Sequence, residues 1–179
     1  MFATGGEKID FITERQLSAG KAKQYQVILA PGVTHLPEDA LRGLAAYEGL
    51  VLTTSAKCLS RDDFDRPQTV GMPKRLQVLP SVSAVELRDA LLPLLKQAEV
   101  TPLVTVRDSA TGQIAWGVEW QTVPTTKGLL VNLVNYMQKP QTVRLEGLQG
   151  TPVNLFTDDA TGSTIDLAPL EPVLLRVGK

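Results

Sequence analysis

Cys58 and His35 are the side chains best suited by type to nucleophilic or acid–base chemistry, since the chain has one cysteine and one histidine. A cysteine nucleophile of the elbow type lies on a tight Gly-x-Cys-x-Gly turn, whose glycines let the backbone bend sharply beneath the thiol. The sequence around this cysteine is Ser55-Ala-Lys-Cys58-Leu-Ser60, without a glycine. We interpret Cys58 as a buried or incidental cysteine, and a hydrolase that uses its thiol is an alternative.

His35 lies just before a helix expected at residues 37–48. A role in the loop or at the start of the helix is the simpler interpretation. Contact with a ligand is the alternative, so His35 is a candidate ligand-binding residue.

Trp116 and Trp120, with Val118 between them, could form a sugar-binding platform. Alternate residues of a strand point to the same face, so the two indoles would lie in line. Rings in line can stack on sugars, but the core of a β-sandwich also needs large inward side chains at this spacing. Core or interdomain packing is our interpretation, and a carbohydrate-binding module that uses Trp116 and Trp120 is an alternative.

Three carboxylates, Asp62, Asp63 and Asp65, lie close together between Arg61 and Arg66. Carboxylates at this spacing could hold Ca²⁺, but an EF-hand would continue with further oxygen ligands, a glycine and a distal glutamate. Ion pairing with the two arginines is the simpler account. We therefore expect no metal site, and nothing in the sequence indicates a cofactor.

A glycosidase needs two carboxylates about 5–10 Å apart across a sugar cleft. Several acidic residues have the right type, but none lies in a recognisable motif, and we assign no catalytic residue. The residues considered are Glu14, Glu86, Asp108 and Glu119.

The composition is that of a soluble globular protein. The 179 residues suit one large domain or two small ones, 43% of them are hydrophobic, and the formal net charge is −1. This balance gives no electrostatic basis for binding nucleic acid or an anionic membrane, so we expect neither partner. A single cysteine excludes an intramolecular disulfide framework. The N-terminus lacks the pattern of a secretory signal, and we expect a cytoplasmic protein.

The first half alternates apolar runs with helical patterns, as expected for a parallel sheet with helices around it. A long polar loop at 55–74 interrupts this alternation, and Pro93 is expected to kink or break the last helix. We predict strands at 8–13, 25–30, 50–54 and 75–79, and helices at 37–48 and 83–99. A doubly wound sheet normally has about five strands, so this one is incomplete.

After a boundary near Pro102 the helical spacing of apolar residues disappears, and only short strands and turns follow. Seven short strands in about 75 residues are typical of a small antiparallel β-sandwich. We predict strands near 102–108, 113–121, 128–136, 140–146, 151–157, 163–167 and 172–177. The sequence thus predicts an α/β domain over 1–100 and a β-sandwich over 101–179.

Both halves resemble the region that follows the catalytic barrel in family 42 glycoside hydrolases, which are β-galactosidase-like proteins. The first half carries the resemblance in KIDFITERQLSAGKAKQYQVILAPGVTHLPEDALRGLAAYEGLVLTTS. The second half carries it in LLVNLVNYMQKPQTVRL, NLFTDDATGSTIDLAP and PVLLRV. In that family the α/β domain is related in fold to glutamine amidotransferases, has no amidotransferase activity and mediates trimer formation.

The sequence also departs from the family pattern. The barrel that carries both catalytic carboxylates has no counterpart here, so neither is transferred to any residue of this chain. The first strand and helix of the α/β domain are lacking too, which affects the expected trimer contacts.

The resemblance implies a non-catalytic accessory and oligomerisation region. Its expected partner is a second copy of the chain or a missing catalytic barrel, with loop 55–74 as the expected contact if it projects from the sheet. Carbohydrate is a further possible partner. A carbohydrate-binding module and an amidotransferase-like hydrolase based on Cys58 are the alternative functions.

Overall fold

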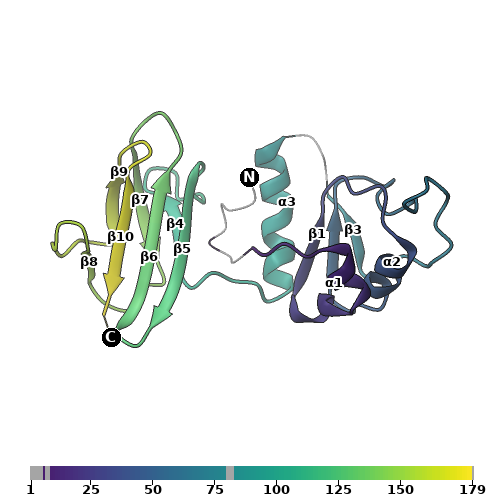
Figure 1. Cartoon of the computed structure of the whole chain (residues 1–179). Helices are drawn as coiled ribbons and strands as arrows, with labels where there is room; N and C mark the ends of the chain where they lie inside the picture. The colour runs from purple at the N-terminus through teal and green to yellow at the C-terminus, as the bar shows by residue number, and fades with distance from the viewer. Residues whose placement is uncertain (1–5, 7–8, 80–82, 179) are drawn as a thin grey trace. The chain divides into compact units, whose positions relative to one another are not determined.

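A computed structural model describes residues 6, 9–79 and 83–178 of the chain (Figure 1). It divides into two compact units, and the boundary lies between Val100 and Thr101. The first unit, from Asp10 to Val100, is α/β; the second contains the remaining described residues and is all-β. The fold class predicted from the sequence, an incomplete parallel sheet followed by an antiparallel sandwich, is confirmed.

The α/β unit is built on three parallel strands in the order β1-β2-β3. Parallel strands covered on both faces are apolar almost throughout, which explains the sequence LVLT in the central strand. The strands are β1 (Val27–Ala30), β2 (Leu50–Thr53) and β3 (Leu76–Val78).

Helices cover both faces of this sheet (Figure 1). Ile28 and Val51 belong to the core cluster on the face of α1 (Glu14–Ser18) and α2 (Glu38–Ala45). Because neighbouring strand residues point to opposite faces, Leu50 and Leu52 belong to the second cluster, with α3. A short 3-10 turn, η1, and helix α3 complete the unit, at Lys21–Gln24 and Ala84–Gln97.

The helices begin where the sequence supplies caps. Thr13 and Gln16 form a reciprocal capping box at the start of α1. At α3 the Ser83 hydroxyl accepts a hydrogen bond from the backbone N–H of Glu86, 3.2 Å away. Helix α3 then runs through Pro93 as one element, so the predicted break does not occur.

Gly43 allows α1 and α2 to pack closely. A Cβ atom at this position would overlap the backbone carbonyl oxygen of Leu17. Leu17 is buried in the same core cluster as Leu41 and Leu44 of α2. The glycine therefore serves this contact, although glycine lowers the intrinsic stability of a helix.

The second unit is a sandwich of two antiparallel sheets, one in the order β5-β6-β10-β8 and one in the order β4-β7-β9. Residues from both sheets meet in one core, which contains Trp120, Leu133, Val143 and Leu175. Each of the seven predicted strands overlaps an observed strand, but the one predicted near 113–121 begins only at Val118. They are β4 (Thr105–Asp108), β5 (Val118–Thr125), β6 (Gly128–Asn135), β7 (Gln141–Glu146), β8 (Pro152–Asn154), β9 (Thr164–Leu167) and β10 (Pro172–Val177).

The strand predicted at 8–13 is wrong where the structure describes it. Residues 9–13 form no strand, and Phe11 is 93% exposed. An extended segment needs a neighbouring strand to satisfy its backbone groups, and the three-stranded sheet pairs β1 only with β2. Alternation in the sequence alone does not supply that neighbour.

Residues 54–75 join β2 to β3 without a helix, as the sequence predicted for 55–74. Of the described helices, none has the length and apolar character needed to cross a bilayer.

Candidate functional site at the carboxyl edge of the parallel sheet

Two loops meet where the parallel strands end: residues 31–37 after β1 and residues 54–75 after β2. Open α/β sheets bind ligands and partners at this edge. The backbone of Arg61 joins the two loops, because its N–H donates to the Thr34 carbonyl and its own carbonyl accepts from the N–H of Leu36. We call residues 54–75 the carboxyl-edge loop.

Asp62 organises the tip of the carboxyl-edge loop. Its Oδ1 accepts the backbone N–H groups of Phe64 and Arg66, at 3.0 and 2.8 Å, and its Oδ2 accepts Nε of Arg66 at 2.7 Å. Burial alone would raise the pKa of the Asp62 carboxyl, but these hydrogen bonds and the Arg66 charge together hold its pKa below the usual value. The ion pairing predicted for this acidic cluster is therefore confirmed for Asp62 with Arg66 and for Asp65 with Arg61.

His35 links the two loops through its side chain. Its Nδ1 lies 2.8 Å from the Thr34 hydroxyl, and its Nε2 lies 3.2 Å from Oδ1 of Asp65. Arg61 also holds Asp65, by a hydrogen bond of 2.9 Å from Nη1 to the Asp65 carbonyl. These contacts give His35 a structural role between loops; a contact with a ligand stays a prediction. Its side chain is half exposed.

Phe64 is the most prominent side chain of this edge, at 72% exposure. The Arg66 guanidinium lies over its ring, 4.8 Å from the centroid. Asp62 accepts hydrogen bonds from the backbone N–H groups of both Phe64 and Arg66. The loop therefore holds the aromatic ring and the guanidinium in a defined geometry. Phe64 was not predicted from the sequence, in which its signal is an Asp with a Phe two residues later and an Arg four residues later.

Cys58 lies beneath this edge in the core. Its side chain is 2% exposed, and its Sγ is 3.8 Å from the carbonyl oxygen of Ala30. A thiol in this position does not reach solvent, so the geometry favours the structural interpretation of Cys58.

The two tryptophans do not form a platform. Trp120 is a core residue, 1% exposed, and its Nε1 donates a hydrogen bond of 2.8 Å to the Val104 carbonyl. Trp116 lies in a turn before β5, because Gly117 adopts φ +74° and interrupts the strand. The prediction that both lie on one strand is therefore wrong. A ligand contact of the half-buried Trp116 stays a prediction.

Two of the four carboxylates considered for glycosidase chemistry form hydrogen bonds within local structure. Glu86 accepts a hydrogen bond of 2.6 Å from the Ser83 hydroxyl at the start of α3. Asp108 accepts the N–H and hydroxyl groups of Thr111 and the N–H of Ala110, and these bonds lower the pKa of its carboxyl. Glu14 belongs to the first turn of α1, and Glu119 belongs to β5.

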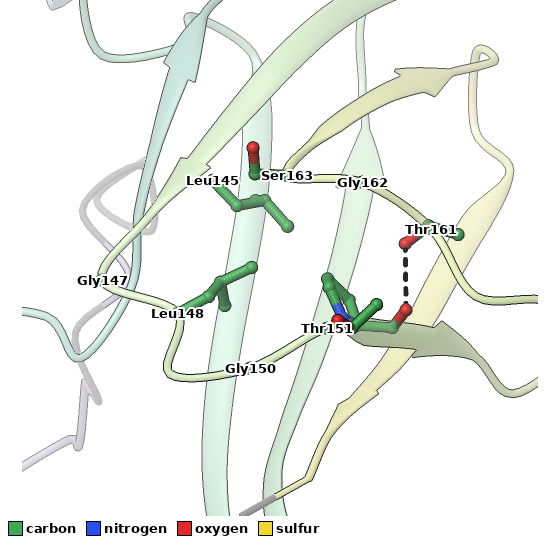
Figure 2. Close-up of a pocket in the computed structure, with 9 residues that line it drawn as sticks. Leu145, Gly147, Leu148, Gly150, Thr151, Thr161, Gly162 and Ser163 are labelled. Carbon is green, nitrogen blue, oxygen red and sulfur yellow. Dashed lines mark hydrogen bonds between the residues drawn. The ribbon is translucent and has the colours of Figure 1, made fainter.

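A shallow pocket of about 330 Å³ lies in the sandwich, between the chain that leaves β7 and the segment before β9 (Figure 2). Leu145 and Leu148 line one part of it, and the Thr161 hydroxyl donates a hydrogen bond to the Pro152 carbonyl at another. Its lining residues carry no titratable side chain. Within residues 6, 9–79 and 83–178, no three histidine, cysteine or acidic side chains are placed to hold a metal ion.

Comparison with solved structures finds the same fold in parts of several glycoside hydrolases. No protein-family model matches the chain, and no curated protein matches its sequence. Among solved structures, a GH42 exo-carrageenase from Bacteroides ovatus aligns with 98% of the chain at 17% identity and a TM-score of 0.73. A GH42 β-galactosidase from G. stearothermophilus aligns with 99% at 14% identity and a TM-score of 0.72. A β-galactosidase from Rahnella sp. R3 aligns with 97% at 12% identity and a TM-score of 0.69.

The match covers only part of each of these proteins. The chain spans 25% of the exo-carrageenase and 35% of each of the two β-galactosidases. The predicted resemblance to family 42 enzymes is thus confirmed at the level of the fold.

Proposed function

We propose that this chain is a non-catalytic accessory and oligomerisation region of a β-galactosidase-like glycoside hydrolase. The observation that carries the proposal is the match of nearly the whole chain to a minor part of several GH42 enzymes. The partners that follow from it are a catalytic barrel and further copies of the chain.

The names of the matching enzymes add a second line of support. One is an exo-carrageenase and the others are β-galactosidases, yet the same two-unit fold occurs in all three. A region shared by enzymes with different substrates is better suited to assembly than to substrate recognition.

The carboxyl-edge loop is our proposed contact to the catalytic part. Phe and Arg are both enriched at protein interfaces, and Arg is among the residue types that contribute most binding energy there. Asp62 holds their backbone in place before binding, which reduces the entropy lost on association.

The proposal is tested by assaying the purified chain with chromogenic β-galactosides and by measuring its mass in solution with light scattering after size exclusion. We expect no turnover above that of a heat-denatured sample, and a mass above that of a monomer. Turnover of a β-galactoside would contradict the proposal. Hydrolysis of the glutamine side-chain amide that is lost in Cys58→Ser would instead support the amidotransferase-like hydrolase.

A further inference from the structure

The two outer faces of the sandwich differ in chemistry. The outer face of the β4-β7-β9 sheet is polar: Arg107 and Arg144 pair with Glu146, at 2.7 and 2.8 Å, and Thr142 donates to Asp166. Such a network satisfies its own charges and stays in contact with water. The outer face of the other sheet has no comparable network among the described residues.

That second face is largely apolar. Strand alternation directs Trp120, Leu133 and Leu175 into the core, so their strand neighbours point outward. The outward apolar side chains are Val123, Leu130, Val134, Val153 and Leu174, and none of them belongs to the core cluster. We call these five residues the apolar sheet face. Val123 is 54% exposed and the other four are partly exposed.

The register distributes the apolar sheet face over four strands, with Arg176 between two of its members. Val123 on β5 lies opposite Leu130 on β6, which lies opposite Arg176 on β10, which lies opposite Val153 on β8. One row further along the strands, Leu174 lies opposite Asn132. Apolar side chains grouped on one sheet face and interspersed with a few polar ones are the composition expected of a contact surface.

Two opposite charges lie at opposite corners of this face. Glu119 on β5 is level with Val134, and Arg176 on β10 is level with Leu130, so they lie on either side of β6 and at different heights along it. Neither forms an ion pair within the described part of the chain. Asn132, which is exposed, lies between them on β6.

We propose that the apolar sheet face is the docking surface for a second copy of this chain. In a symmetric pair, one surface patch contacts itself, so that residue i meets residue j and j meets i. A two-fold axis in the plane of the face brings Glu119 over Arg176 of the second copy, and Arg176 over Glu119 of the second copy. Asn132 then lies at the axis, where two side-chain amides can donate to and accept from each other.

The composition of the face favours this partner over other classes. One acid and one base cancel, which gives no attraction for nucleic acid or an anionic surface. The patch has no aromatic ring for stacking on a sugar. The two sheets would cross at a steep angle, as in orthogonal sheet packing, because the charges lie on a diagonal.

The size of the face determines the strength of the pair. Four strands about 4.8 Å apart and three outward rows give an area of roughly 300 Å². A standard interface buries about 800 Å² on each partner. The dimer should therefore be weak and concentration-dependent. The inference rests on the proposed function only in assuming that the chain self-associates. It adds the surface through which two copies would meet.

Sedimentation velocity of the full chain, over roughly 5 to 500 µM, tests the inference. Leu130→Lys should abolish the concentration dependence, whereas Thr164→Lys, on the polar outer face, should leave it unchanged. Glu119→Arg and Arg176→Glu should each weaken the dimer roughly tenfold by placing like charges together, and the double reversal should restore it. Circular dichroism and thermal melting confirm that each variant is folded.

The outcomes separate the surface from the function. An oligomer that resists Leu130→Lys and both charge reversals would overturn the apolar sheet face as the interface and leave the proposed function standing. A wild-type chain that is monomeric at every concentration would overturn the inference together with the oligomerisation role. If each single charge reversal weakens the dimer and the double reversal does not restore it, the pairing of Glu119 with Arg176 is overturned.

Discussion

The indole Nε1 of Trp120 donates a hydrogen bond of 2.8 Å to the backbone carbonyl of Val104, and both residues are buried. Trp120 belongs to β5 of the four-stranded sheet, whereas Val104 directly precedes β4 of the three-stranded sheet. The bond therefore ties the two sheets together across the core, in addition to the apolar packing of the ring.

Trp120→Phe is expected to lower the free energy of unfolding by about 2–4 kcal/mol, because the Val104 carbonyl loses its donor and the smaller ring leaves a cavity. Chemical denaturation followed by circular dichroism measures the loss. Trp116→Phe is the matched control, because Trp116 is only half buried. This substitution should lower the free energy of unfolding by clearly less than Trp120→Phe does. Equal losses in the two variants would contradict the role of the hydrogen bond.

Asp62→Asn should loosen the carboxyl-edge loop without unfolding the α/β unit. The amide has one acceptor oxygen where the carboxylate has two, and the charge that pairs with Arg66 is lost. Hydrogen exchange should become faster at the amides of Phe64 and Arg66. Asp63→Asn changes a neighbouring carboxylate and should leave both amides protected; unchanged exchange in Asp62→Asn would argue against this account of the loop.

Glu146 should make the sandwich sensitive to acid. Its hydrogen bond from Arg107 is the largest cause that lowers the pKa of the Glu146 carboxyl, and the Arg107 and Arg144 charges add to it. The folded pKa is below the unfolded value of about 4.3, so the stabilisation is present above that value and is lost as the pH falls through the folded pKa.

Thermal melts between about pH 6 and pH 3 check this sign. The melting temperature of Glu146→Gln should fall less steeply with decreasing pH than that of the wild type. The melting temperature of Arg107→Gln should also depend less on pH, because this substitution removes the main cause of the lowered pKa of Glu146. A Glu146→Gln profile parallel to the wild type would refute the assignment.

Gly43→Ala should destabilise the α/β unit, against the usual preference. Alanine in a helix interior is favoured over glycine by about 1 kcal/mol. Here the added methyl overlaps the Leu17 carbonyl, and α1 must move away from α2, at a cost of about 1–3 kcal/mol. Gly71→Ala meets no atom within 4 Å and is the control for denaturation measurements. A stabilising Gly43→Ala would show that the helices adjust freely.

Cys58 should react slowly with iodoacetamide in the native protein and fast after denaturation, because its thiol is buried. The ratio of the two rates reports how rarely the core opens. Labelling at neutral pH, followed by mass spectrometry, gives both rates. Fast native labelling would revive the nucleophile hypothesis for this residue.

The strands and helices that sequence reasoning predicted correctly carry a strong local signal in their own residues, either an apolar run or a cap. The apolar run of β2 and the serine cap of α3 are local signals of this kind. The strand predicted at 8–13 failed because its existence depends on a neighbouring strand, and β1 pairs only with β2.

The functional residues were harder to predict, because they depend on geometry between segments. The four-residue spacing of Trp116 and Trp120 places both on one face only if the strand is unbroken, and Gly117 breaks it. The hydrogen bonds of Asp62 to the backbone of its own loop depend on how that loop turns, which the order of residue types does not reveal.

The position of β10 sets the time at which the sandwich can form. This strand lies between β6 and β8, and it contributes Leu175 and Val177 to the core. During synthesis, β5 and β6 can pair as soon as they leave the ribosome, but β8 has no neighbour in its sheet until residues 172–177 arrive. The sandwich therefore closes late in translation, and the unpaired edge of β6 is the stretch that a chaperone would have to shield until then.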